Sequence, residues 1–278
     1  MKLTRREFHS VTGGAMLAGL TQTYKRVTFG TQSYSFRDRS IDAMIDGMRQ
    51  IGLSNVELWQ GHIEPKNVSR DEMRKWRETV SLDEFRKIKE QFDRGGIAIT
   101  AYNISFKDDF SDAEIERGFE MTKALGSKLI TASANTAVVS RVAPAARRHK
   151  IPVAMHNHSR IAPNEFATPD DFTKAMAAGP FIATNLDIGH YTAANFDAVA
   201  FLQQHHDRIL SLHIKDRKRN DGPNVPFGEG DTPIGPVLRL LRDRGWAIPA
   251  NIEYEYKGGD TVQEVKRCLE FCRRQLDS

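Results

Sequence analysis

Four ionisable residues recur along the second half of the chain at intervals of about one strand and one helix. They are His156, Asp187, His213 and Glu253, separated by 31, 26 and 40 residues, and each ends a β-rich run. Parallel strands joined by helices end at the same edge, so neighbouring strands would aim these side chains into one pocket. Two imidazoles and two carboxylates suit Mn²⁺, Zn²⁺, Co²⁺ or Fe²⁺ better than Ca²⁺. The spacing therefore predicts a site for one divalent metal ion.

A metal-free polar pocket is the alternative interpretation of these residues. One histidine at a strand end is more often a structural, hydrogen-bonded residue than a metal ligand. Four ionisable residues on successive strands favour the metal site, because a barrel interior gives a charged side chain little structural use.

Alternating β-rich and amphipathic stretches predict the elements that position these residues. Strands are expected at Val27–Tyr34, Asn55–Trp59, Ile97–Tyr102, Lys128–Ala132, Val153–His156, Ile182–Asp187, Ile209–Lys215 and Asn251–Tyr256. Helices are expected at Ile41–Ile51, Leu82–Asp93, Asp112–Leu125, Ala137–His149, Pro169–Ala177, Asn195–Gln204, Pro233–Arg244 and Thr261–Leu276. This number of strand–helix units is typical of a (β/α)8 barrel, whereas a doubly wound sheet usually has fewer strands. We therefore expect residues 25–278 to form one α/β domain, a (β/α)8 TIM barrel.

Long irregular stretches are expected after three of the strands. They are Gln60–Val80, His158–Thr168 and Asp216–Thr232. The loops that follow barrel strands build the active site, so these stretches would surround the predicted ligands. Lys215, Arg217 and Lys218 are expected to form mostly a solvated face.

Charge and composition exclude two classes of partner. The formal net charge is +4, and the first 26 residues, with five basic residues and one acidic residue, account for it. The rest of the chain is close to neutral, which argues against nucleic acid. No apolar run approaches the roughly 20 residues that cross a bilayer, so no membrane span is predicted. Cys268 and Cys272 share an apolar helical stripe and are expected in the core.

Residues 1–24 are interpreted as an export-signal-like segment. The motif TRREF at residues 4–8 resembles a twin-arginine signal, and a weakly apolar stretch, Val11–Leu20, follows it. Such signals carry folded proteins across the bacterial inner membrane. We expect an exported, periplasmic location. Cleavage of the segment stays open, and a basic, frayed start of the chain is the alternative.

Five short motifs make the chain resemble the xylose isomerase-like TIM barrels, which include sugar phosphate isomerases, ketose 3-epimerases and, more distantly, endonuclease IV. The motifs are VELW at 56–59 with His62 after it, LDIGH at 186–190, HIKD at 213–216, FGEGD at 227–231 and IEYE at 252–255. The resemblance covers residues 27–275. The D-x-G-H and H-x-K-D motifs in this order are specific for the superfamily but do not identify the substrate.

The resemblance implies a metal-dependent enzyme that moves a proton next to a sugar carbonyl. Asp187, His213 and Glu253 would bind the metal. The ion would polarise a carbonyl and its neighbouring hydroxyl, and Glu253 would move the proton through an enediolate. His190 and Arg219 would hold substrate hydroxyls.

The fifth strand departs from the family pattern. Ketose epimerases of this family have a glutamate there that is both ligand and second proton carrier, whereas this chain has His156, followed by Asn157 and His158. Imidazole can replace the ligand, so His156 stays a predicted ligand and catalytic residue, but the exchange between two glutamates is lost. Glu165 and Glu57 are candidates for the missing base, and each is alternatively a rim or loop carboxylate.

Further residues near strand ends are expected to bind the sugar. The predicted substrate-binding set consists of His190, Arg219, His158, Glu57, Trp59 and His62. Tyr34, Phe36, Trp59 and Tyr102 either form an aromatic wall against a sugar face or simply pack. The glycine loop at 227–231 precedes a helix, where barrels often bind phosphate, but Glu229 and Asp231 would repel it. An unphosphorylated sugar is therefore predicted.

The leading hypothesis is a metal-dependent isomerase or epimerase of an unphosphorylated keto-sugar. A keto-sugar lyase or hydratase starts with the same proton abstraction and is the first alternative. A non-catalytic sugar-binding barrel is the second. An enzyme like endonuclease IV is disfavoured, because the additional Asp-x-His pair that it needs is missing from Asp216–Asp231. Whether the chain forms a homo-oligomer stays open.

Overall fold

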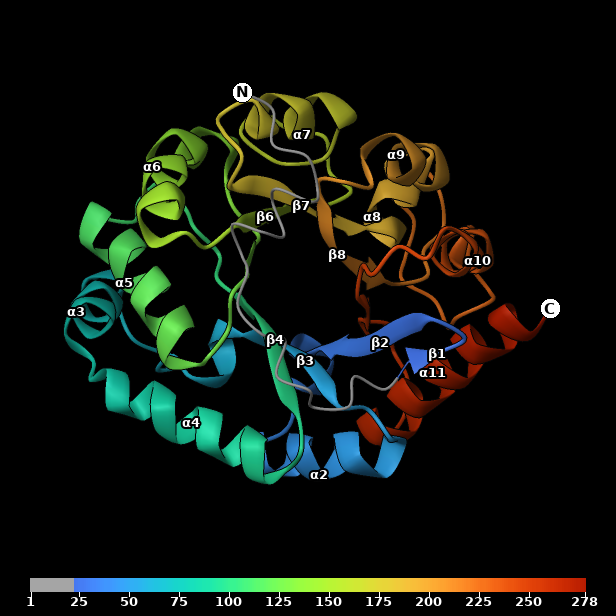
Figure 1. The fold of residues 1–278 in the computed structure, drawn as a ribbon, viewed down its shortest axis with the longest axis horizontal. Coiled ribbons are helices and arrows are strands. Elements are labelled where there is room, and N and C mark those ends of the chain that lie inside the picture. Colours follow the sequence, from blue (N-terminus) through green and yellow to red (C-terminus); the bar gives the residue numbers. More distant parts are fainter. Residues whose placement is uncertain (1–22) are drawn as a thin grey trace.

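Parallel strands close on themselves in the computed structural model, which describes residues 23–278. The strands are β2 (Val27–Gln32), β3 (Asn55–Trp59), β4 (Ala98–Asn103), β5 (Ile130–Ala132), β6 (Val153–His156), β7 (Ile182–Asp187), β8 (Ile209–Ile214) and β9 (Ala250–Ile252). Each pairs with the next, and β2 also pairs with β9 (Figure 1). The predicted (β/α)8 barrel is confirmed. A short strand, β1 (Thr23–Tyr24), runs antiparallel to β2.

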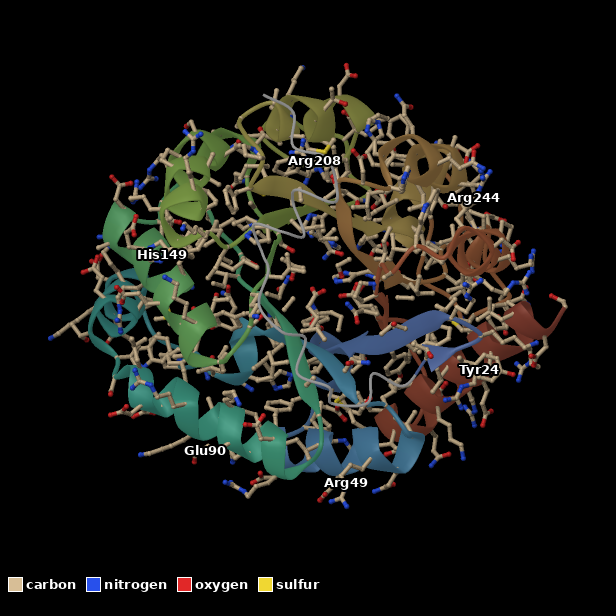
Figure 2. The ribbon with its side chains drawn as sticks, in the orientation of Figure 1. Tyr24, Arg49, Glu90, His149, Arg208 and Arg244 are labelled. Atoms are coloured by element: carbon tan, nitrogen blue, oxygen red, sulfur yellow. The ribbon has the colours of Figure 1, made fainter. Side chains whose placement is uncertain are left out.

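Helices form a ring around the strands (Figure 1). They are α2 (Ile41–Ile51), α3 (Arg70–Thr79), α4 (Leu82–Arg94), α5 (Asp112–Ala124), α6 (Val139–His149), α7 (Pro169–Met176), α8 (Ile188–Ala193), α9 (Ala198–His205), α10 (Ile234–Arg244) and α11 (Thr261–Asp277). Exposed side chains such as Arg49, Glu90 and Arg244 point outward from this ring (Figure 2). The predicted export signal lies outside the described residues. Within residues 23–278, no helix is long and apolar enough to cross a bilayer.

Capping residues start several helices. Ser111 and Glu114 form a capping box at the start of α5, and Thr168 and Asp171 form one at the start of α7. Gly52 ends α2 in the left-handed conformation, with a φ of 79°. Cys268 and Cys272 are free and buried in the core, as predicted.

The strand register brings the predicted ligands to one rim. Asp187 on β7 pairs with His213 on β8, and His156 at the end of β6 pairs with Asn185 on β7. Glu253 follows β9, and its backbone amide donates to the carbonyl of Ile214 at 3.0 Å. Strands β6 to β9 therefore present these four side chains at neighbouring positions.

One predicted loop contains a helix. The prediction of an irregular chain over residues 60–80 is wrong, because α3 occupies its second half. This helix is strongly polar, so apolar periodicity did not reveal it. Ser69 and Glu72 start it with a capping box, and Arg70 and Arg77 bind Glu114 of α5 at 2.7 and 3.2 Å. Its capping box was the signal that the sequence offered.

Candidate metal centre and active site

The predicted ligands meet at the carboxyl ends of β6 to β9. One ligand atom each of His156, Asp187 and His213 lies within 4.8 Å of the others. Glu253 joins them through Oε2, which lies 3.1 Å from His213 Nδ1. All four residues are buried, and no more than 7% of any of them is exposed.

Each of these residues has one buried atom without a hydrogen bond to the described residues. The atoms are His156 Nδ1, Asp187 Oδ2, His213 Nδ1 and Glu253 Oε2. A buried polar atom without a hydrogen bond costs about 1–3 kcal/mol, so native proteins contain few of them. Asp187 Oδ2 and Glu253 Oε2 do form ion pairs with Lys215. Two imidazole nitrogens and two carboxylate oxygens are a donor set for a divalent transition ion. The arrangement could hold one such ion.

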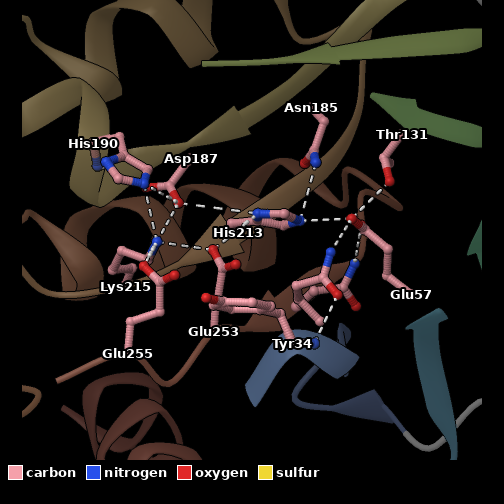
Figure 3. Close-up of polar contacts among 12 residues, drawn as sticks. Tyr34, Glu57, Thr131, Asn185, Asp187, His190, His213, Lys215, Glu253 and Glu255 are labelled. Carbon is pink, nitrogen blue, oxygen red and sulfur yellow. Dashed lines mark hydrogen bonds and ion pairs between the residues drawn. The ribbon is translucent and has the colours of Figure 1, made fainter. Parts of the chain in front are cut away.

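Glu57 orients His213 from the barrel interior (Figure 3). A carboxylate only accepts hydrogen bonds, so His213 Nε2 donates to Glu57 Oε1 at 2.8 Å, and Nδ1 is left for the cluster. Residues from five other strands hydrogen-bond to the same carboxylate: Gln32, Asn103, Thr131, Ser211 and Asn251. Glu57 is fully buried and is not among the residues that line the cavity described below. Its position suits an anchor for His213, whereas the sequence predicted a substrate contact or a base.

Lys215 lies inside the site. Its Nζ lies 3.3 Å from Asp187 Oδ2 and 3.0 Å from Glu253 Oε2, and it also contacts Glu255 Oε2 (Figure 3). One buried ammonium group therefore binds three carboxylates.

The prediction of a solvated face is wrong for Lys215 and Arg217. They are only 2% and 8% exposed. Lys215 follows His213 by two positions, and the period of a strand directs both side chains to the barrel interior. This spacing could have identified Lys215, but the run of charged residues after it was typical of a solvated surface.

The charges of the cluster shift its pKa values. Burial raises the pKa of Asp187 to about 6, against the opposing effect of Lys215. Burial also raises the pKa of Glu253, but Lys215 and His213 outweigh it and hold that pKa well below its ordinary value. Glu253 is therefore ionised, as a base must be.

The two imidazoles of the cluster differ in their protonation. Burial lowers the pKa of His156, and the neighbouring His213 lowers it further, so this ring is neutral. Burial acts in the same direction on His213, but the carboxylates of Glu57 and Glu253 outweigh it and raise that pKa well above its ordinary value.

The cluster faces an open cavity of about 840 Å³. The predicted site residues that line it are Trp59, His156, His158, His190, His213 and Glu253. Sequence reasoning did not assign a site role to other residues that line it: Gln32, Asn103, Ser105, Lys107, Ser133, Lys215 and Glu255. Gln32 and Asn103 are the last residues of β2 and β4. The strand-end criterion missed them because it covered only ionisable side chains and because these strands were expected to end at Tyr34 and Tyr102.

Besides Glu57 and Asp187, three predicted residues do not line this cavity. Glu165 Oε2 lies 4.0 Å from His158 Nδ1, beside the cavity wall. Arg219 is exposed. His62 hydrogen-bonds to the carbonyl of Ser33 at 2.9 Å and packs edge-on against the Trp59 ring.

Of the four residues predicted to form an aromatic wall, two line the cavity and two lie in the hydrophobic core. Tyr34 and Trp59 line the cavity and contact each other edge to face, with ring centroids 4.9 Å apart. Phe36 and Tyr102 are buried in the hydrophobic core. Two aromatic side chains are therefore available to a ligand from this set.

The glycine loop after β8 is closed by a carboxylate of the same chain. Asp216 Oδ2 accepts hydrogen bonds from the amides of Gly228 and Gly230 at 2.8 and 3.0 Å, and Oδ1 accepts from the amide of Thr232 at 3.2 Å. A Cβ at Gly230 would lie 1.9 Å from Asp216 Oδ1, so this close approach requires glycine. The backbone donors of this loop are therefore occupied.

Removal of the Lys215 ammonium is expected to make stability depend on an added cation. In Lys215→Met, the buried carboxylates of Asp187 and Glu253 and the half-buried one of Glu255 lose a shared partner, so the free energy of unfolding should fall by about 3 kcal/mol or more in EDTA. Mn²⁺ should restore part of that loss. Urea unfolding with EDTA or with Mn²⁺ measures both effects.

Lys218→Met is the matched control for this prediction. The Lys218 side chain is 46% exposed in the same loop, so its replacement should change the free energy of unfolding by less than about 0.5 kcal/mol. A Lys215→Met protein as stable as the unmodified chain in EDTA would contradict the structural role of Lys215.

Comparisons with known proteins agree with this architecture. The xylose isomerase-like TIM barrel family matches residues 45–275. L-ribulose-5-phosphate 3-epimerase UlaE of Escherichia coli is 29% identical over 98 residues, which are 35% of this chain and 34% of that protein. The alignment thus spans about a third of the length of this curated relative.

Solved structures share the barrel at low identity. The IolI protein with a binding zinc atom has a TM-score of 0.69 at 15% identity, over 90% of this chain and 98% of that one. The 3-keto-D-glucoside 4-epimerase YcjR of Escherichia coli has a TM-score of 0.67 at 16% identity, over 89% and 99%. These two likenesses show the fold, and the family match spans most of the barrel. The chain belongs to the xylose isomerase-like TIM barrel family.

Proposed function

We propose that the protein is a divalent-metal-dependent isomerase or epimerase of an unphosphorylated keto-sugar. The observation that carries this proposal is the convergence of four donor atoms without hydrogen bonds beside an open polar cavity. Membership of a family whose relatives include sugar epimerases supports the reaction class. The zinc atom of the IolI protein supports a metal on this fold.

Glu253 is the residue proposed to move the proton. A divalent ion held by His156, Asp187, His213 and Glu253 would polarise a substrate carbonyl and stabilise the enediolate charge. Glu253 is ionised and lines the cavity, so it can take a proton from the neighbouring carbon. Because Lys215 and His213 lower its pKa, it is a weak base, and the carbon has to be acidified by its adjacent carbonyl.

A second proton carrier is needed for epimerisation but not for elimination. The candidates Glu57 and Glu165 do not line the cavity, and the other cavity carboxylate, Glu255, is paired with Lys215. Lys215 also contacts Glu253, so the cavity offers one carboxylate of the ligand cluster as a base, which suits a reaction that abstracts a proton and then expels a leaving group. A keto-sugar lyase or hydratase is therefore the second candidate function.

The closed glycine loop supports an unphosphorylated substrate. Helix-start amides after the late strands of a barrel commonly bind phosphate. Here Asp216 occupies the amides of Gly228, Gly230 and Thr232. A phosphate at this loop would have to displace a carboxylate that is 97% buried, since Asp216 is 3% exposed.

Proton exchange tests the proposed chemistry. The metal-loaded protein, incubated in D₂O with a panel of keto-sugars and ketoglycosides, should incorporate deuterium at a carbon next to the carbonyl of its substrate. Glu253→Gln removes the base and should reduce exchange by about 100-fold or more. NMR of the products distinguishes an epimer from an eliminated sugar.

Glu229→Gln is the matched control, because Glu229 is an exposed carboxylate on the same rim. This variant should catalyse deuterium exchange at the rate of the unmodified protein. Sugar binding without exchange in every compound would exclude both enzymatic proposals and indicate a non-catalytic sugar-binding barrel. Exchange that survives in Glu253→Gln would exclude Glu253 as the base.

Metal binding is expected at about one divalent ion per chain, with an affinity that depends on Glu57. Glu57→Gln removes the charge that orients His213 and should weaken binding roughly 10- to 100-fold. Calorimetric titration with Mn²⁺ or Zn²⁺ measures stoichiometry and affinity, with Glu229→Gln again as the control. Full catalytic activity in a strong chelator, with no metal detected by elemental analysis, would refute the metal proposal.

We also propose that the protein is exported through the twin-arginine pathway. The motif at residues 4–8 and the basic excess of residues 1–26 support this location. Replacement of Arg5 and Arg6 by lysine should leave metal content unchanged and trap the protein in the cytoplasm. Cell fractionation that finds the unmodified protein wholly in the cytoplasm would refute the proposal.

A further inference from the structure

His190 lies between two cationic side chains at the cavity wall. Its Nδ1 lies 2.6 Å from Arg217 Nη1, and its Nε2 lies 3.1 Å from Lys215 Nζ (Figure 3 shows the second contact). The side chain is 13% exposed and lines the cavity. A neutral imidazole carries one hydrogen, so its two nitrogens cannot both accept hydrogen bonds. Only one of these cations can donate to the ring.

The guanidinium determines which nitrogen accepts. Arg217 has only donors and stays charged at ordinary pH, so His190 Nδ1 has to accept from it. Lys215 has other partners for its charge, because its Nζ hydrogen-bonds to Glu255 and forms ion pairs with Asp187 and Glu253. The single hydrogen of His190 therefore belongs on Nε2.

The surroundings keep this ring neutral. A protonated ring would carry a hydrogen on both nitrogens, so it would place donors against Arg217 at 2.6 Å and against Lys215 at 3.1 Å. Nε2 also lies 3.9 Å from Asp187 Oδ2, too far for a hydrogen bond. An Nε2–H group and the Lys215 ammonium are thus two donors that lie 3.1 Å apart at the cavity wall.

We propose that Arg217 is a positioning residue that holds His190 as the Nε2–H tautomer, so that His190 and Lys215 together present donors to one substrate oxygen. The chemical identity of that oxygen, a sugar carbonyl or hydroxyl, rests on the function proposed above, whereas the tautomer does not. In this form Nε2 has no free lone pair. His190 is therefore neither a base nor a metal ligand, although its ring centroid lies only 5.9 Å from that of His156.

Arg217 is itself fixed by two loops. Its Nη1 donates to Ser159 Oγ in the loop after β6 at 2.7 Å. Its Nε and Nη2 donate to the carbonyl of Gly222 in the loop after β8 at 3.0 and 2.5 Å. These bonds leave the guanidinium little freedom to turn away from His190. The tautomer is therefore set by the loops after β6 and β8 that hold Arg217.

Nitrogen NMR tests the proposal without a substrate. In protein labelled with ¹⁵N-histidine, long-range ¹H–¹⁵N spectra distinguish a protonated from an unprotonated ring nitrogen, and His190→Gln assigns the signals. We expect Nδ1 of His190 to be unprotonated and Nε2 to be protonated. Arg217→Met should allow the Nδ1–H tautomer to appear, Arg217→Lys should retain Nε2–H by supplying a donor, and Lys218→Met should match the unmodified protein.

The same variants connect the tautomer to turnover. Arg217→Met should lower the deuterium-exchange rate roughly 10- to 100-fold, with partial recovery in Arg217→Lys. An Nδ1–H signal in the unmodified protein, or an unchanged tautomer in Arg217→Met, would overturn the proposal. If the tautomer is as expected but no keto-sugar exchanges, the tautomer assignment stands and the proposed reaction is what fails. If Arg217→Met does not fold, the spectra of the unmodified protein and of Arg217→Lys still decide the tautomer.

Discussion

A single buried ammonium group makes this arrangement of carboxylates tenable. Lys215 Nζ lies 3.3 Å from Asp187 and 3.0 Å from Glu253, and it also contacts Glu255. Without a cation, these carboxylates would be anions in a low-dielectric interior, where each costs several kcal/mol. Lys215 comes from the same face of β8 as His213, because the two residues are two positions apart. One strand therefore provides both an imidazole of the site and the charge that balances its carboxylates.

Each imidazole is hydrogen-bonded on one ring nitrogen by a residue outside the cavity, and this bond determines which nitrogen faces the cluster or the cavity. Glu57 binds Nε2 of His213, so Nδ1 faces the cluster, and Arg217 binds Nδ1 of His190, so Nε2 faces the cavity. Glu57 in turn accepts hydrogen bonds from residues of five other strands. This explains why the barrel interior at this level is lined by amides and hydroxyls instead of apolar side chains. The geometry of the site depends on the whole ring of strands.

The barrel and the ligand set could be predicted because both follow from regular spacing. His156, Asp187 and His213 occupy strand ends, and the strand register then places Asp187 beside His213. The role of Glu57 could not be predicted in this way, because the residues that hold it lie on five strands and up to 194 positions away. No local sequence pattern indicates a set of hydrogen bonds between residues that are so far apart along the chain.

Other differences have local physical causes. Lys215 stands at the start of a run of charged residues, of which Lys218 and Arg219 are exposed whereas Asp216 and Arg217 are buried. Only the spacing of Lys215 from His213 indicated that its side chain is buried. Helix α3 has almost no apolar stripe, and ion pairs of Arg70 and Arg77 with the buried carboxylate of Glu114 hold it in addition to the packing of Trp76. Periodicity detects hydrophobic faces, and it does not detect elements that are held by charge.

X-ray absorption at the metal edge of Co²⁺-loaded protein tests the central claim most directly, since it reports the atoms bound to the ion. The account predicts two imidazole nitrogens and carboxylate oxygens at about 2.0–2.2 Å. His213→Ala should remove one imidazole from that spectrum, and Lys218→Met should leave it unchanged. An ion that is surrounded only by water and oxygen ligands, or a spectrum unchanged in His213→Ala, would contradict the account.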